Sequence, residues 1–76
     1  MMAKVTMTRA ARWSRQANDF IRARIHTNAQ ADELAEYLNM TGDSVRKRLQ
    51  GNVPWRLDEV LNALEFYATE PSEVMR

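Results

Sequence analysis

The chain has few of the residues that cross-link small folds, bind metals or break helices and strands. Its 76 residues contain no cysteine, one histidine, two glycines and two prolines. Without cysteine there is no disulfide framework and no thiolate zinc site, and His26 alone cannot supply a metal site with spaced ligands. No apolar run approaches the ~20 residues of a membrane span. No signal peptide is evident either, so we expect a soluble, intracellular protein.

Charge is nearly balanced in sum but unevenly distributed along the chain. Residues 1–26 carry six basic side chains against one acidic, a net charge of +5, whereas the net charge is −1 over residues 27–51 and −3 over residues 52–76. Such polarity suits a domain that presents one basic face to a polyanion. The alternative is that these charges pair with one another across the fold.

Apolar residues recur at three- and four-residue steps, and no segment alternates as a strand does. A chain of this length holds one small domain. We therefore predict an all-α fold, a compact four- to five-helix bundle over residues 9–76, preceded by a flexible N-terminal arm at residues 1–8. The expected helices are 9–25, 27–38, 42–50, a fourth from Pro54 or Trp55 to Pro71, and a final turn at 72–75.

Local signals mark the ends of the two central helices. Thr27 and Gln30 have the spacing of a capping box. Asn39 suits the left-handed conformation of a turn, Thr41 can cap the next helix, and Gly51 can end it. Two short helices joined by a tight turn form a helix-turn-helix, which places its second helix in the major groove of DNA.

The stretch from Arg12 to Leu64 resembles the lambda-repressor-like family, the Cro/repressor-type (XRE-like) helix-turn-helix proteins. The resemblance rests on apolar motif positions followed by a stop, a proline loop and another apolar helix: Leu34, Ala35, Leu38, Met40, Val45, Gly51, Pro54 and Leu57–Leu64. The sequence has Asn39 where the family carries a turn glycine and Ala31 where it carries glutamine. Arg48 occupies a position that is apolar in the family, and either Arg48 or the neighbouring Leu49 faces the core.

The resemblance makes residues 42–50 the candidate recognition helix. We expect Arg46 and Lys47 to read bases, because an arginine fork matches the two acceptors of guanine. Asp43 can accept from a cytosine amino group or hold Arg46 or Lys47 in position. Contacts to bases or the backbone are expected from the remaining candidates: Thr41, Ser44, Arg48, Gln50, Asn52, Arg56 and Arg12.

The predicted function is that of a sequence-specific double-stranded DNA-binding transcriptional regulator, most simply a small Cro-type repressor that occupies an operator. It is expected in the bacterial cytoplasm or nucleoid, or in the host cytoplasm if phage-encoded. No nucleophile–base pair or phosphate loop indicates an enzyme, and no cofactor, membrane or small-molecule substrate is expected. A homodimer is predicted through the C-terminal segment: Phe66, Tyr67, Val74 and Met75.

Two alternatives remain open at this stage. One is an excisionase or architectural DNA-binding accessory protein, although such proteins often insert a β-ribbon. The other is an antitoxin- or antirepressor-type protein-interaction module, in which the basic groove binds an acidic partner.

Overall fold

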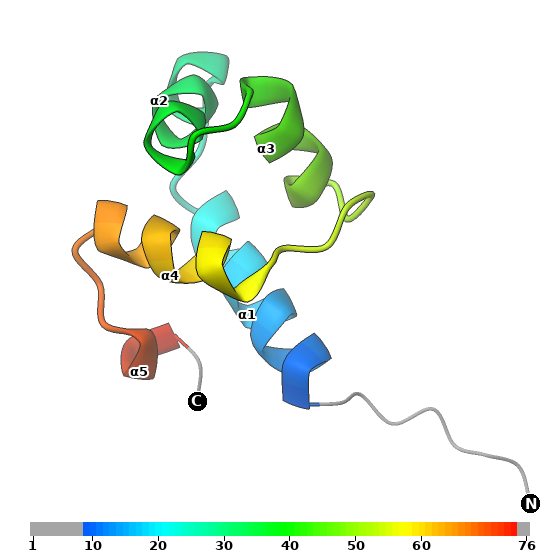
Figure 1. The fold of residues 1–76 in the computed structure, drawn as a ribbon, viewed down its shortest axis with the longest axis vertical. Coiled ribbons are helices and arrows are strands. Elements are labelled where there is room, and N and C mark those ends of the chain that lie inside the picture. The colour runs from blue at the N-terminus through cyan, green and yellow to red at the C-terminus, as the bar shows by residue number, and fades with distance from the viewer. Residues whose placement is uncertain (1–8, 75–76) are drawn as a thin grey trace, which may run out of the picture.

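The computed structural model describes the backbone of residues 9–74 and the side chains of residues 12–74. The predicted arm at residues 1–8 lies outside this part of the chain. The described residues form five α-helices and no strand, which confirms the all-α fold (Figure 1). The helices are α1 (Arg9–Arg22), α2 (Asn28–Leu38), α3 (Gly42–Leu49), α4 (Leu57–Phe66) and α5 (Pro71–Val74).

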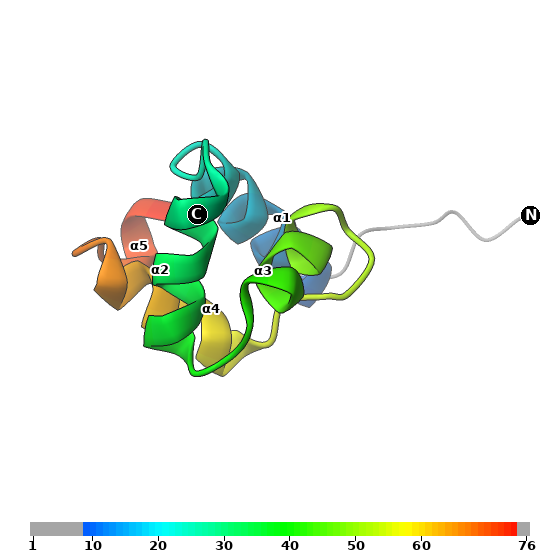
Figure 2. The same cartoon turned by 90° about the horizontal axis from the view of Figure 1, so that it is seen from above.

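The central unit of the bundle is the α2–α3 pair. The two helices lie side by side, and α5 lies on the side of the molecule away from α3 (Figures 1 and 2). Helix α2 also packs on α4, while α1 contacts α3, α4 and α5. The core between these helices is made of small and branched apolar side chains with one tryptophan: Ala17, Ile21, Ala31, Leu34, Ala35, Val45, Trp55, Val60, Ala63, Leu64 and Val74.

The predicted caps of the central helices are present. The Thr27 hydroxyl accepts from the Gln30 amide at 3.2 Å, and the Gln30 side chain accepts in return from the Thr27 amide at 3.0 Å. Asn39 adopts the left-handed conformation (φ 61°, ψ 46°) that reverses the chain after α2. Thr41 caps α3, and Gly51, with φ 84°, directly follows its C-cap. A three-residue turn therefore joins α2 to α3.

Helix α4 begins later than predicted. Trp55 lies outside the helix because its buried ring is held by a hydrogen bond from Nε1 to Asn18 Oδ1 (2.8 Å). The Arg56 amide then donates to Glu59 Oε1 at 3.0 Å, which fixes the helix start at Leu57. Within the apolar segment Leu57–Leu64, Val60 and Leu64 are buried, whereas Leu57 and Leu61 are 52% and 41% exposed.

The first helix is shorter than its apolar pattern suggested. It ends at Arg22, three residues before the predicted end, and Ile25 packs on the core from the connection to α2. Of the two tryptophans, Trp55 is buried and Trp13 is partly buried against the core. None of the helices in residues 9–74 is long and apolar enough to cross a membrane.

The C-terminal segment folds back onto the bundle. The Tyr67 ring packs edge-on against Phe20 of α1, with centroids 6.0 Å apart, and Val74 is buried. Of the residues predicted to form a dimer surface, these two therefore serve the core, and Met75 lies outside the described residues. Phe66 remains 37% exposed and packs beside Tyr37 of α2.

Candidate nucleic-acid interface

Helix α3 is anchored on one side and open to solvent on the other. Val45 is fully buried against α2, and Leu49 packs partly into the core. Asp43, Lys47 and Gln50, spaced four and three residues apart, are exposed. This spacing places Asp43 and Lys47 on one stripe of α3, and Gln50 continues the stripe at the C-cap, so the helix presents a polar ridge outward.

The N-terminal end of α3 is organised by Thr41 and Ser44. The Thr41 hydroxyl accepts from the Ser44 amide at 3.1 Å and donates to the Ser44 hydroxyl at 3.0 Å. Gly42 follows the cap, and a side chain there would collide with the carboxylate of Asp32 on α2. Glycine at this position therefore leaves room for the Asp32 carboxylate in the conformation in which it faces Arg46.

Two of the basic residues on α3 form exposed ion pairs. Arg46 Nη1 lies 3.7 Å from Asp32 Oδ1, and Lys47 Nζ lies 3.3 Å from Asp43 Oδ2. The four side chains are between 38% and 66% exposed. Such surface pairs contribute about 0–1 kcal/mol and are screened by salt, so a DNA phosphate or base edge can replace either acid. Asp43 thus does hold Lys47, one of the two roles considered for it.

Arg48 is in a different situation. Its Nε and Nη2 donate to the two carboxylate oxygens of Glu59 at 2.9 and 3.0 Å, and its Nη1 donates to the Ser44 carbonyl at 3.0 Å. The Arg48 and Glu59 side chains are only 15% and 13% exposed. The guanidinium N–H donors that form these bonds all point into the protein. Arg48 ties α3 to α4, and Leu49 beside it packs on the core.

Three residues that sequence reasoning did not select hold this arrangement together. Asn18 on α1 accepts from Trp55 Nε1 and donates through Nδ2 to the Leu49 carbonyl at 3.4 Å. Asp32 and Glu59 supply the acids opposite Arg46 and Arg48. The sequence signal for Asn18 was a polar residue next to the apolar stripe of α1, and Glu59 stands three residues after Arg56, at the spacing of a capping box.

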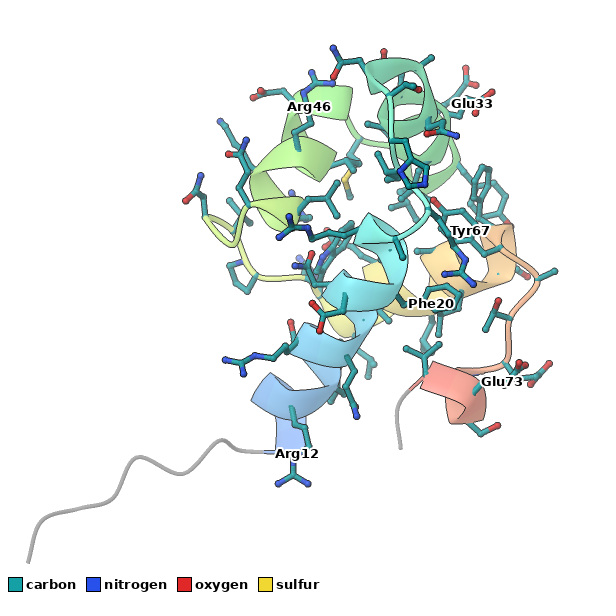
Figure 3. The ribbon with its side chains drawn as sticks, turned by 180° about the vertical axis from the view of Figure 1, so that it is seen from behind. Arg12, Phe20, Glu33, Arg46, Tyr67 and Glu73 are labelled. Carbon is teal, nitrogen blue, oxygen red and sulfur yellow. The ribbon has the colours of Figure 1, made fainter. Side chains whose placement is uncertain are left out.

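The other predicted site residues lie around α3 at different distances. The side-chain Nδ2 of Asn52 donates to Gln50 Oε1 at 3.1 Å, so these two side chains lie together after the helix. Arg56 is exposed and pairs with Asp58 at 3.4 Å. Arg12 projects from the N-terminal end of α1, far from Arg46 (Figure 3). The structure brings together Thr41, Ser44, Arg46, Lys47 and Asp43, but not Arg12.

Helix α1 carries the cations that are free of acids. Within the described residues, no ion pair involves Arg12, Arg15 or Arg22, and all three are exposed. Their spacing of three and seven residues places them on one side of α1. Among the described residues, the arginines without an ion-pair partner are therefore three on α1 and Arg24 just after it, and none of them lies on α3.

No family model matches the chain, and no curated protein or solved structure matches it. In residues 9–74 no group of three or more histidine, aspartate or glutamate side chains is arranged to hold a metal ion.

Proposed function

We propose that the protein binds double-stranded DNA sequence-specifically, with α3 in the major groove, and regulates transcription by occupying an operator in the manner of a Cro-type repressor. The observation that carries this proposal is the exposed ridge of Asp43, Lys47 and Gln50 on a helix that follows α2 after a three-residue turn. The major groove, ≈ 12 Å wide, admits a single α-helix in this way.

The roles of the side chains follow from their freedom to move. Lys47 and Arg46 read base edges after releasing their exposed acids, and the Gln50 amide, which can both donate and accept, lies on the same ridge. Thr41 and Ser44 lie at the start of the helix, where hydroxyls and amides bind phosphate. Arg48 does not read DNA in this proposal, because its donors are engaged with Glu59 and the Ser44 carbonyl.

Selection from a pool of random duplexes tests the proposal. The wild-type protein is expected to enrich one motif, and Arg46→Ala is expected to lose discrimination at one or two positions of it, by about 1–3 kcal/mol each. Arg24→Ala is the control, because Arg24 stacks on Phe20 of α1, away from α3. Enrichment of no motif by the wild-type protein would falsify the proposal.

A two-fold operator requires a dimer, and the apolar residues left exposed limit where it can form. Of the C-terminal residues considered for this role, Phe66 is available, together with Tyr37 beside it. We expect a palindromic selected site and sedimentation as a dimer that Phe66→Ser weakens. A monomer at high protein concentration and on single half-sites would exclude this part of the proposal.

One observation favours a second candidate, an antitoxin- or antirepressor-type module that binds a protein. Each of the three basic residues on α3 has an acidic partner, which reduces the attraction of this helix for a polyanion. Duplex binding that survives moderate salt distinguishes DNA recognition from this candidate. An architectural accessory protein, the other alternative, would bend the duplex, which circular permutation of the selected site detects.

A further inference from the structure

The C-terminal end of α1 and the side of α3 enclose a cleft of about 290 Å³. Arg22 and Arg46 stand on its two sides, and Ile25, Leu49 and Gln50 complete its lining. Arg22 is exposed and forms no ion pair within the described residues, while Arg46 has only the long, exposed contact with Asp32. Two arginines from different helices therefore line one open cleft, and both side chains are accessible from it.

The lining of the cleft matches the chemistry of a phosphodiester. A guanidinium group presents a planar fork of donors that fits phosphate oxygens, and two forks can hold one phosphate from both sides. Ile25 and Leu49 are partly buried apolar residues that can support the aliphatic stems of the arginines. Gln50 adds an amide donor on the exposed ridge of α3.

A simpler role for Arg22 would be to compensate the partial negative charge at the end of α1. Arg24 already performs this role more directly, because its Nη1 donates to the Phe20 carbonyl at 3.1 Å while its guanidinium stacks on the Phe20 ring. No hydrogen bond to a helix carbonyl is formed by Arg22 in the described residues. Its exposed guanidinium therefore has no ion-pair partner within the described residues.

We propose that the cleft between Arg22 and Arg46 seats one backbone phosphate of the duplex, next to the bases that α3 reads. The proposal rests on the proposed DNA-binding function and adds to it the residue that fixes how α3 is set in the groove. Arg22 contacts the phosphate from α1, and Arg46 turns from Asp32 so that its fork reads the adjacent base edge while its charge faces the same phosphate.

Salt dependence of binding to the selected duplex tests the proposal. Each phosphate that a protein neutralises contributes about −0.9 to the slope of log K against log salt concentration. Arg22→Gln is expected to reduce the magnitude of the slope by about 0.9 and to weaken binding roughly 5-fold at moderate salt. Arg22→Lys keeps the charge but loses the fork, so its slope should stay near wild type while its affinity falls by a smaller factor.

Arg24→Gln is the matched control, since it removes the same charge two residues away, outside the cleft. Its slope is expected to equal that of the wild type. Circular dichroism and thermal melting verify that each variant is folded. In the wild-type protein, the NMR signal of the Arg22 side-chain Nε–H should shift on addition of the duplex, which tests the contact without a substitution.

The outcomes separate this proposal from the one on which it rests. If the wild type binds DNA but Arg22→Gln has an unchanged slope, the cleft is not a phosphate site and the proposed function stands. Equal losses in Arg22→Gln and Arg24→Gln mean that only net charge matters, which also overturns the cleft. If the wild type does not bind any duplex, both proposals fail.

Discussion

Helices α1 and α3 both carry several arginines, but they use them differently. On α3, Arg46, Lys47 and Arg48 each face an acid, whereas on α1 the side chains of Arg12, Arg15 and Arg22 have no ion-pair partner among the described residues. The most conspicuous basic run in the sequence is therefore the less available one. The capacity of a cation to bind a polyanion is therefore set by its neighbours in the fold.

The pairs on α3 also differ among themselves. Arg46 and Lys47 are in exposed pairs with one contact each, while Arg48 is in a largely buried, bidentate pair. Separating charges in water costs little, but leaving one charge buried without its partner costs several kcal/mol. Helix α3 thus has two cations that can exchange their acidic partners for DNA and one that holds the helix in place.

The largest effect is expected from Glu59→Gln, which breaks the buried pair. Glu59 accepts two bonds from Arg48 and one from the Arg56 amide, so its loss leaves a buried guanidinium uncompensated and weakens the start of α4. We expect the free energy of unfolding to fall by about 2–4 kcal/mol, somewhat below the value for a fully buried pair. Urea denaturation followed by circular dichroism measures the change.

Asp58→Asn is the control for Glu59→Gln, because Asp58 is the adjacent acid and its pair with Arg56 is exposed. Its effect should stay below about 1 kcal/mol. If the two substitutions cost the same, Arg48 is as free as the arginines of α1, and the contrast between the helices disappears.

The second effect, on binding rather than stability, is expected from Arg15→Gln. Arg15 is exposed on the arginine side of α1 and lines a cleft with Gly51, Pro54 and Trp55, beside the end of α3. Its removal should leave the melting temperature unchanged and weaken duplex binding about 3–5-fold across all sequences, since a phosphate contact carries no base specificity. Fluorescence anisotropy with selected and scrambled duplexes measures both. A loss confined to the selected duplex would contradict this assignment.

The sequence was sufficient for the fold class and the central turn, because these depend on local chemistry. Thr27, Asn39, Thr41 and Gly51 act within four residues of their own positions, so capping and turn rules located them. The start of α4 was not predictable in this way. It depends on the contact of Trp55 with Asn18, thirty-seven residues earlier in the chain, which no local pattern encodes.

The candidate site was predicted as a set of residue types, but not as a set of pairings. Spacing placed Arg46 and Lys47 on α3 and suggested the contact of Lys47 with Asp43, since i,i+4 partners lie on the same helix. Spacing did not reveal Asp32 or Glu59, because they come from other helices. Spacing alone also could not decide whether Arg48 or Leu49 faces the core. Both side chains point inward, and an arginine can do so only because Glu59 on α4 supplies a buried acid.

The third effect is expected from Asp32→Asn, which removes the exposed acid opposite Arg46. The change frees the guanidinium and takes a negative charge away from the start of α3, so duplex affinity should rise about 2–3-fold at moderate salt, less than the gain at low salt. The side chain keeps its size, and the melting temperature should change little. Anisotropy titrations at two salt concentrations measure the gain, and Glu36→Gln, which removes another exposed acid of α2, is the matched control. Equal gains from both variants would mean that the change in net charge, and not the release of Arg46, raises the affinity for the duplex.

The smallest effect concerns Arg24, the arginine near the end of α1 that is engaged within the fold. It lies 5.8 Å from the Tyr67 ring, and its charge partly opposes the burial that raises the pKa of the Tyr67 hydroxyl. A raised pKa in the folded state means that the neutral hydroxyl is favoured by folding. This contribution to stability is complete below the ordinary pKa of 10.0 and is lost as pH rises through the higher folded value.

Tyr67→Phe should therefore lose less stability than the wild type as pH rises above about 10. Arg24→Gln should raise the pKa further, as the ultraviolet absorbance of the phenolate records. An unchanged titration in Arg24→Gln would show that this arginine is as independent of the fold as Arg22.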